Sequence, residues 1–255
     1  SGADNTAIGS LALHYNTTAS NNTAVGKSAL QENTTGLNNT ALGSKALKNA
    51  TTGNNHVAVG YEALNANTTG LNNTALGATS LQLNTTGGYN LAAGKRALQS
   101  NTTASFNTGL GTDSLRLNTT GTRNTAVGYG SLDANTTASD NSAFGYNALS
   151  SNITGLNNVA IGATALENAT ISNNNVAVGS RALKQLTSGL NNTALGMGAL
   201  QATTTAESNV AVGVSALNAN TASYNTAVGR DALKANTTGS SNIAVGRQSL
   251  YKATT

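Results

Sequence analysis

The chain of 255 residues contains no cysteine, no proline and no tryptophan. Without cysteine it can form neither a disulfide nor a thiolate metal site. Without proline every residue keeps the backbone N–H group that a β-ladder requires. Only 38% of the residues are hydrophobic, 4% are aromatic and 9% are charged. This composition argues against an ordinary globular core.

The sequence also lacks the features expected for binding a nucleic acid or for spanning a membrane. The 13 basic and nine acidic residues give a formal net charge of +4, but Lys and Arg form no run. A nucleic-acid interface would need a basic stripe with stacking aromatics, so we expect no nucleic-acid partner. No segment approaches the roughly 18 apolar residues of a membrane-spanning helix. We therefore expect no membrane segment.

The residues that carry chemistry are few and scattered. The two histidines, His14 and His56, have no second His or Cys near them in the repeat frame described below, so we expect no metal. No two acidic residues occupy the same position of adjacent repeats, and no phosphate-binding loop pattern occurs. We therefore expect no catalytic residue, no cofactor and no enzyme activity.

What the chain does have is a repeat. Glycine recurs at every seventeenth position from Gly9 to Gly213, and again at Gly229 and Gly246, where the first of these two steps is shorter by one. The fifteen repeats follow the pattern N-T-A-V-G-x-x-A-L-x-x-N-T-T-G-x-N, which we number from its leading Asn as position 1. Position 5 is always Gly and position 9 is always Leu. Because nothing interrupts the repeats, we expect one repeat domain over residues 1–255.

Each repeat predicts a short strand at positions 1–5. In NVAVG (175–179), Val176 and Val178 share one side of a strand and Ala177 faces the other. We expect the apolar residue of position 4 and the Leu of position 9 to form the core. Positions 6–11, as in KRALQS (95–100), predict a second short strand, with one helical turn as the alternative. The one deletion, near residues 221–224, indicates a turn at positions 13–17.

Repeats of this length are too short for ankyrin or leucine-rich units. They predict an all-β fold, a parallel β-solenoid of fifteen 17-residue coils stacked about 4.8 Å apart. Identical side chains would then stack, and buried Asn amides would bond from coil to coil. The expected structural ladder comprises Gly26, Gly43, Gly60, Leu30, Leu47, Leu64, Asn16, Asn33 and Asn67.

Two further columns are candidate surfaces. One coil buries too little apolar area to offset its conformational entropy, so we expect self-association through a further face. The small Ala residues of position 3 are the candidate self-association face, with a solvated column as the alternative: Ala24, Ala41, Ala58 and Ala75. The Thr residues of position 13 are the candidate ice-binding or surface-binding face, with a structural hydroxyl ladder as the alternative: Thr17, Thr34, Thr51, Thr68 and Thr85.

Tyr129 and Tyr146 occupy the same position of adjacent repeats and should stack as neighbours. A cross-strand aromatic pair is the favoured interpretation, and a small sugar-contact platform is the alternative.

The motifs NVAVG (175–179 and 209–213), NVAIG (158–162) and NIAVG (242–246) resemble those of YadA-like head domains of trimeric autotransporter adhesins. The NTAVG–AL–NTTG repeats are similar to those of phage and viral tail-fibre shafts. The resemblance covers all fifteen repeats. It implies a left-handed parallel β-roll, three chains side by side, and a place on a surface fibre.

The function expected from the sequence is therefore structural. We expect an extracellular module, on a cell or virion surface, that acts as the rigid shaft or filament of an adhesin-like appendage or tail fibre. The expected partner is the chain itself, as a homotrimer or an end-to-end filament, with a cell-surface or glycan target engaged through further domains. Ice binding through a threonine ladder is the alternative function.

Overall fold

The computed structural model describes residues 2–253, and the regular elements among them are β-strands joined by turns, without a helix. The described residues accordingly contain no helix long and apolar enough to cross a membrane. The chain divides into two compact units, an N-terminal unit that ends at Asn124 and a C-terminal unit that begins at Thr125. Each unit is a parallel β-solenoid, so the predicted all-β solenoid class is confirmed.

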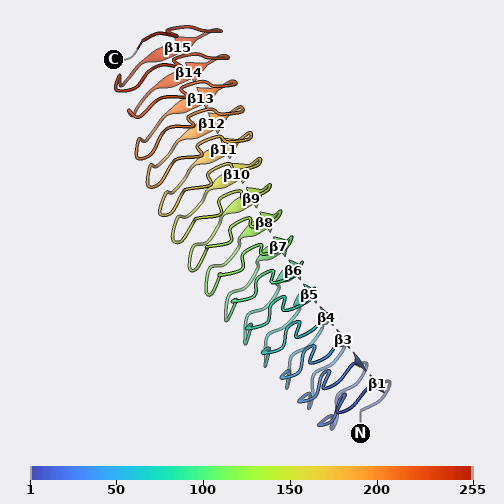
Figure 1. The fold of residues 1–255 in the computed structure, drawn as a ribbon. Helices are drawn as coiled ribbons and strands as arrows, with labels where there is room; N and C mark the ends of the chain where they lie inside the picture. Colours follow the sequence, from blue (N-terminus) through green and yellow to red (C-terminus); the bar gives the residue numbers. More distant parts are fainter. Residues whose placement is uncertain (1, 254–255) are drawn as a thin grey trace. The chain divides into compact units, whose positions relative to one another are not determined.

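The N-terminal unit has one three-residue strand in each coil, and the strands lie side by side in chain order (Figure 1). Neighbouring strands are parallel, and each residue pairs with its equivalent in the next coil, as Thr6 does with Thr23. The strands are β1 (Thr6–Ile8), β2 (Thr23–Val25), β3 (Thr40–Leu42), β4 (Val57–Val59), β5 (Thr74–Leu76), β6 (Leu91–Ala93) and β7 (Thr108–Leu110).

The C-terminal unit repeats this arrangement with eight strands. These are β8 (Thr125–Val127), β9 (Ser142–Phe144), β10 (Val159–Ile161), β11 (Val176–Val178), β12 (Thr193–Leu195), β13 (Val210–Val212), β14 (Thr226–Val228) and β15 (Ile243–Val245). The deletion shortens the connection between β13 and β14, where Val210 pairs with Thr226. The missing residue falls in the bend before Asn225, so the predicted turn at positions 13–17 is confirmed.

The predicted second strand at positions 6–11 is wrong, and so is the alternative of a helical turn. This segment forms two consecutive tight turns. In the second coil the Ala29 N–H donates to the Gly26 carbonyl at 3.2 Å, and the Asn33 N–H donates to the Leu30 carbonyl at 3.3 Å. Ser28 and Leu30 have φ angles of 57° and 49°. Left-handed residues at both positions are incompatible with a strand and with a right-handed helix.

The Leu of position 9 takes this left-handed conformation in every coil, from Leu13 to Leu250. The conformation costs a non-glycine residue about 1 kcal/mol or more. Two contacts offset that cost in the second coil: the Leu30 N–H donates to the Ala46 carbonyl of the next coil at 3.1 Å, and the Leu30 side chain is fully buried. The left-handed turn directs this leucine into the coil.

The two sides of the strand are opposite to the prediction. Position 3 faces the interior, and its Ala side chains are fully buried within the single chain: Ala24, Ala41, Ala58 and Ala75. Position 4 faces outward, and Leu76 is 40% exposed. The coil is so narrow that Ala at positions 3 and 8 and Leu at position 9 fill it. The proposed Ala self-association face is therefore wrong, because these methyl groups are not on the surface.

Replacing a small interior residue by a large one tests this orientation. Ala58→Leu should lower the free energy of unfolding by about 1–3 kcal/mol, because the interior has no room for a longer side chain. Urea denaturation measures the change. Val59→Leu is the matched control on the outward side and should shift stability by no more than about 0.5 kcal/mol. An equal cost for the two variants would contradict the orientation.

Candidate functional site

A pair of asparagine side chains closes several of the coils. In the second coil the amide of Asn22, at position 1, donates to the Gly36 carbonyl at 2.9 Å. The amide of Asn33, at position 12, donates to the same carbonyl at 3.0 Å. Both side chains are fully buried. Two separate parts of the coil are thus joined at one backbone oxygen, an arrangement which we call the asparagine clamp.

The same asparagines align neighbouring coils. Asn22 Oδ1 accepts the backbone N–H of Asn39 at 2.9 Å, and Asn175 Oδ1 accepts that of Asn192 at 2.9 Å. A register shift would leave these buried amides without partners, at a cost of about 1–3 kcal/mol for each group. The asparagines of position 1 therefore fix the register of each unit.

Position 12 forms a second ladder that is interrupted. The amide of Asn84 donates to Asn67 Oδ1 at 2.8 Å, and that of Asn101 donates to Asn84 Oδ1 at 2.7 Å. Before Asn67 the ladder is broken, because Ala50 occupies position 12. Asn16 takes part in its own coil by donating to the Ala19 carbonyl at 3.2 Å, but its buried Oδ1 has no hydrogen-bond partner among the described residues.

His56 takes the place of asparagine at position 1. Its Nδ1 accepts the backbone N–H of Asn73 at 3.2 Å, and its Nε2 lies 2.7 Å from the Gly70 carbonyl, to which it donates. The neutral ring thus supplies one acceptor and one donor, as the asparagine amide does in the other coils. Burial lowers the pKa of His56 to about 4, against the hydrogen bond to the Gly70 carbonyl, which raises it.

The ladder glycines stand where coils come closest. Gly26 and Gly43 have φ angles of 133° and 135°, and Gly60 has one of 133°. A Cβ on Gly26 would lie 2.5 Å from the carbonyl oxygen of Gly43. Position 5 therefore needs glycine for both its conformation and its contact. Leu30, Leu47 and Leu64 are fully buried behind this corner.

The threonines of position 13 donate their hydroxyl protons to the next coil. Thr34 Oγ1 donates to the Thr51 carbonyl at 3.0 Å, and Thr85 Oγ1 donates to the Thr102 carbonyl at 3.0 Å. The same bond is made by Thr17, Thr51 and Thr68. Position 14 carries a separate rank of exposed threonines in the N-terminal unit: Thr18, Thr35, Thr52, Thr69, Thr86, Thr103 and Thr120.

Two pairs of exposed aromatic rings stack between adjacent coils. Tyr129 and Tyr146 have ring centroids 5.6 Å apart with an angle of 11° between the planes. Tyr89 and Phe106 are 5.2 Å apart, also at 11°. The predicted stacking of Tyr129 on Tyr146 is confirmed. Because the two rings stack face to face, each covers one face of its partner. The pair therefore does not form a flat surface of two adjacent rings on which a sugar could lie.

The outward sheet face consists of positions 2 and 4 of the strands. It carries no charged residue in either unit. In the N-terminal unit Val57 is 37% and Leu76 is 40% exposed, and in the C-terminal unit Leu195 is 46% exposed. Side chains at positions 2 and 4 lie on the same side of a strand. Each unit thus presents an uncharged surface along its stacked strands, apolar at position 4 and a mixture of threonine, serine and apolar residues at position 2.

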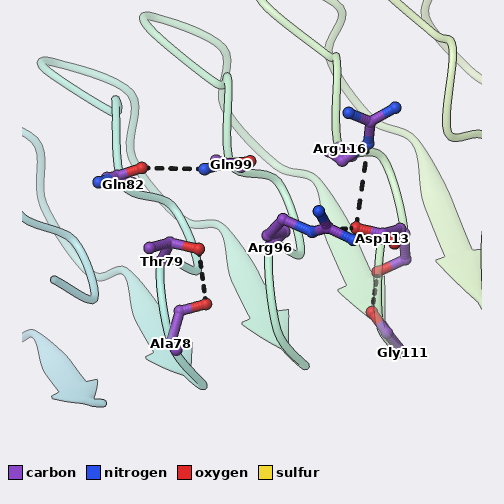
Figure 2. Close-up of polar contacts among 9 residues, drawn as sticks. Ala78, Thr79, Gln82, Arg96, Gln99, Gly111, Asp113 and Arg116 are labelled. Carbon is purple, nitrogen blue, oxygen red and sulfur yellow. Dashed lines mark hydrogen bonds and ion pairs between the residues drawn. The ribbon is translucent and has the colours of Figure 1, made fainter. Parts of the chain in front are cut away.

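A polar surface follows the two turns of the coils, at positions 6, 7 and 10, and we call it the charged edge. Figure 2 shows part of it in the N-terminal unit, where the Arg96 guanidinium lies against Asp113. Arg96 Nη2 donates to Asp113 Oδ2 at 2.7 Å, and Arg96 Nε lies 2.7 Å from Oδ1. In the same view the amide of Gln99 donates to Gln82 Oε1 at 2.9 Å. Polar side chains of successive coils thus bond directly along this edge.

Lys45 and Glu62 form another such pair, with Nζ 2.9 Å from Oε1. The hydrogen bond from Lys45 is the main reason that the pKa of Glu62 lies below its usual value. The sequence prediction missed these pairs, although a signal was present: Lys45 and Glu62 both occupy position 7 of adjacent repeats, as do Arg96 and Asp113. Opposite charges at the repeat spacing would have identified them.

In the described part of the chain no three residues of the His, Cys, Asp and Glu types gather as a metal site would require. No protein-family model matches the chain, and no curated protein sequence matches it. A function is therefore argued from the ladders, the outward sheet face and the charged edge.

The position 12 ladder generates a pair of opposite stability predictions. Asn84→Ala should lower the free energy of unfolding by about 1–3 kcal/mol, because it removes two bonds and leaves the buried amide of Asn101 with one acceptor fewer. Ala50→Asn should raise it by about 1 kcal/mol by joining Asn33 to Asn67. Denaturant unfolding measures both. Destabilisation by Ala50→Asn would show that the gap does not accept the amide.

His56 makes stability depend on pH. Its pKa is about 4 in the folded chain and about 6.5 in the unfolded chain, so the unfolded chain binds more protons between these values. The His56 contribution is complete above about pH 6.5 and is lost as pH falls toward 4, by on the order of 3 kcal/mol.

Unfolding measured from pH 7 to pH 4 tests this contribution. His56→Asn restores the repeat residue and should flatten the profile relative to the wild-type chain. His14→Asn changes an exposed histidine and should leave the profile as it is. Identical profiles for wild type and His56→Asn would refute the assignment.

Proposed function

We propose that the chain is a structural module of an extracellular fibre, like the shaft of a tail fibre or the head of a trimeric adhesin. In this proposal copies associate side by side as a homotrimer through the outward sheet face, on a cell or virion surface. The proposal takes the roll to be left-handed and the copies to be three, as the resemblance to YadA-like repeats implies.

The outward sheet face is the observation that carries the proposal. In the N-terminal unit its position 4 column consists of Ile8, Val25, Leu42, Val59, Leu76, Ala93 and Leu110. Contiguous exposed apolar patches on soluble monomers are small, and larger ones mark interaction surfaces. A second copy offers the same flat, uncharged, regularly spaced surface. Association would bury these side chains. The interface would then add apolar burial to that of the coil interior, which is too narrow for large side chains.

The hydrogen bonding between coils supports a mechanical role. In the N-terminal unit the Thr23 N–H donates to the Asn39 carbonyl and the Gly26 N–H donates to the Ile8 carbonyl, both at 2.8 Å. The asparagine clamps and the Thr hydroxyls add side-chain bonds between or within coils. Backbone bonded in this way resists local opening, and therefore proteolysis and bending. A rigid spacer needs this property.

Ice binding is the second candidate function, and the rank of exposed threonines at position 14 is the observation that favours it. The originally expected rank at position 13 has committed its hydroxyl protons to carbonyl oxygens. Inhibition of ice recrystallisation by the wild-type chain, lost in Thr35→Lys/Thr69→Lys, would support this function. Equal inhibition by wild type and variant would exclude the position 14 rank.

Light scattering after size-exclusion chromatography, with negative-stain imaging, tests the fibre proposal. The chain has a mass of 25.3 kDa, so light scattering should give the wild type about three times this mass. Leu42→Lys/Leu76→Lys places two charges on the outward sheet face and should give a folded monomer, because desolvating charges at an interface is unfavourable.

The matched control is Thr35→Lys/Thr69→Lys, which adds the same two charges at exposed position 14. It should keep the wild-type mass. A wild-type chain that stays monomeric across the accessible concentration range would reject side-by-side association. So would an oligomer that both variants leave intact.

A further inference from the structure

The basic residues of the N-terminal unit gather on the charged edge, although they are scattered in the sequence. Seen by repeat position, six of them lie at positions 6, 7 and 10, and only Glu62 and Asp113 among the acidic residues do so, a formal excess of four positive charges. The six are Lys27, Lys45, Lys48, Lys95, Arg96 and Arg116. The remainder of this unit carries Arg123 against Asp4 and Glu32. Six of the seven Lys and Arg residues of this unit therefore lie on the charged edge.

Ion pairing within the edge leaves part of this charge free. Glu62 is held by Lys45, and Asp113 is held by Arg96. Within residues 2–124 the other three lysines, Lys27, Lys48 and Lys95, form no ion pair. Lys27 and Lys95 are exposed and Lys48 is half-buried. These ammonium groups remain available to an external anion.

Neutral hydrogen-bonding groups separate the cations along the edge. Figure 2 shows Thr79 and Gln82 on the coil beside that of Arg96, and Gln99 on the coil of Arg96 itself. Asn65 lies on the same surface, where its amide donates to the Lys45 carbonyl at 3.0 Å. Amides and hydroxyls that lie between two groups of positive charge match a polymer bearing both hydroxyl groups and acidic groups, which is the chemistry of an acidic polysaccharide.

The spacing of the charge separates this polymer from a nucleic acid. Seven coils at about 4.8 Å span roughly 34 Å, so the excess amounts to about one charge per 8 Å. Duplex DNA carries one charge per about 1.7 Å of its axis. The edge is therefore too sparsely charged to match a duplex, and it suits a linear polymer with charges one or two sugar rings apart.

We propose that the charged edge of the N-terminal unit binds a linear acidic polysaccharide, with its free lysines contacting the carboxylate or sulfate groups and its amides contacting the hydroxyls. The edge is distinct from the outward sheet face, so the site would give the proposed fibre module a ligand of its own and does not depend on trimer formation.

Titration calorimetry at about 0.1 M ionic strength, where the Debye length is about 10 Å, tests the site with an oligogalacturonate as the probe. The variant Lys27→Gln/Lys48→Gln/Lys95→Gln should lose about tenfold or more in affinity, the combined effect of three modest exposed interactions. Wild-type affinity should also fall as salt rises, because exposed charges are screened. The oligomeric state of each sample is measured in parallel. A chain that does not form trimers is thereby distinguished from a chain that does not bind the polysaccharide.

The matched control is Thr35→Glu/Thr52→Glu/Thr86→Glu, which changes the net charge by the same three units at exposed position 14. It should keep the wild-type affinity within about twofold, because its charges lie off the edge. An equal loss in both triple variants would show a net-charge effect and overturn the site. Absence of wild-type binding, equal binding of neutral dextran, or tighter binding of duplex DNA would each overturn the proposal as well.

Discussion

The asparagine clamp is the interaction on which the rest of the structure depends. Two buried amides, such as those of Asn22 and Asn33, meet at one carbonyl of their coil, and the same side chains accept from or donate to neighbouring coils. A buried polar group without a partner costs far more than a satisfied one contributes. The polar half of each coil is therefore stable in one register only, and that register aligns every other column of side chains.

The clamp also determines which residues are left for the surface. The residues of positions 1 and 3 lie on the same side of the strand, so closing the coil brings Ala58 inside and turns Val59 outward. The interior accepts only small residues and one leucine per coil. The larger apolar side chains form the outward sheet face, and polar and charged residues form an edge along the two turns. The proposed association and the proposed polysaccharide site use these two surfaces.

Much of the architecture could be predicted from periodicity. The even spacing of glycines such as Gly26 and Gly43, the strand at NVAVG, the turn at the deletion and the stacking of Tyr129 on Tyr146 all follow from residues that recur in register. The two turns at positions 6–11 could not be predicted, because leucine gives no sequence signal for a left-handed conformation. Leu30 adopts it because burial and the bond to Ala46 outweigh an intrinsic cost.

The sequence by itself determined the period, the parallel stacking and the identity of each column, because Gly at position 5 and Leu at position 9 recur in every repeat and bring equivalent positions side by side. Tertiary structure alone decided which side of the strand faces inward and which surface carries the charge. Alternation along a strand distinguishes two sides without saying which is buried. The width of the closed coil decides which side is buried. Its interior has room for the methyl group of Ala58, and Val59 lies outside.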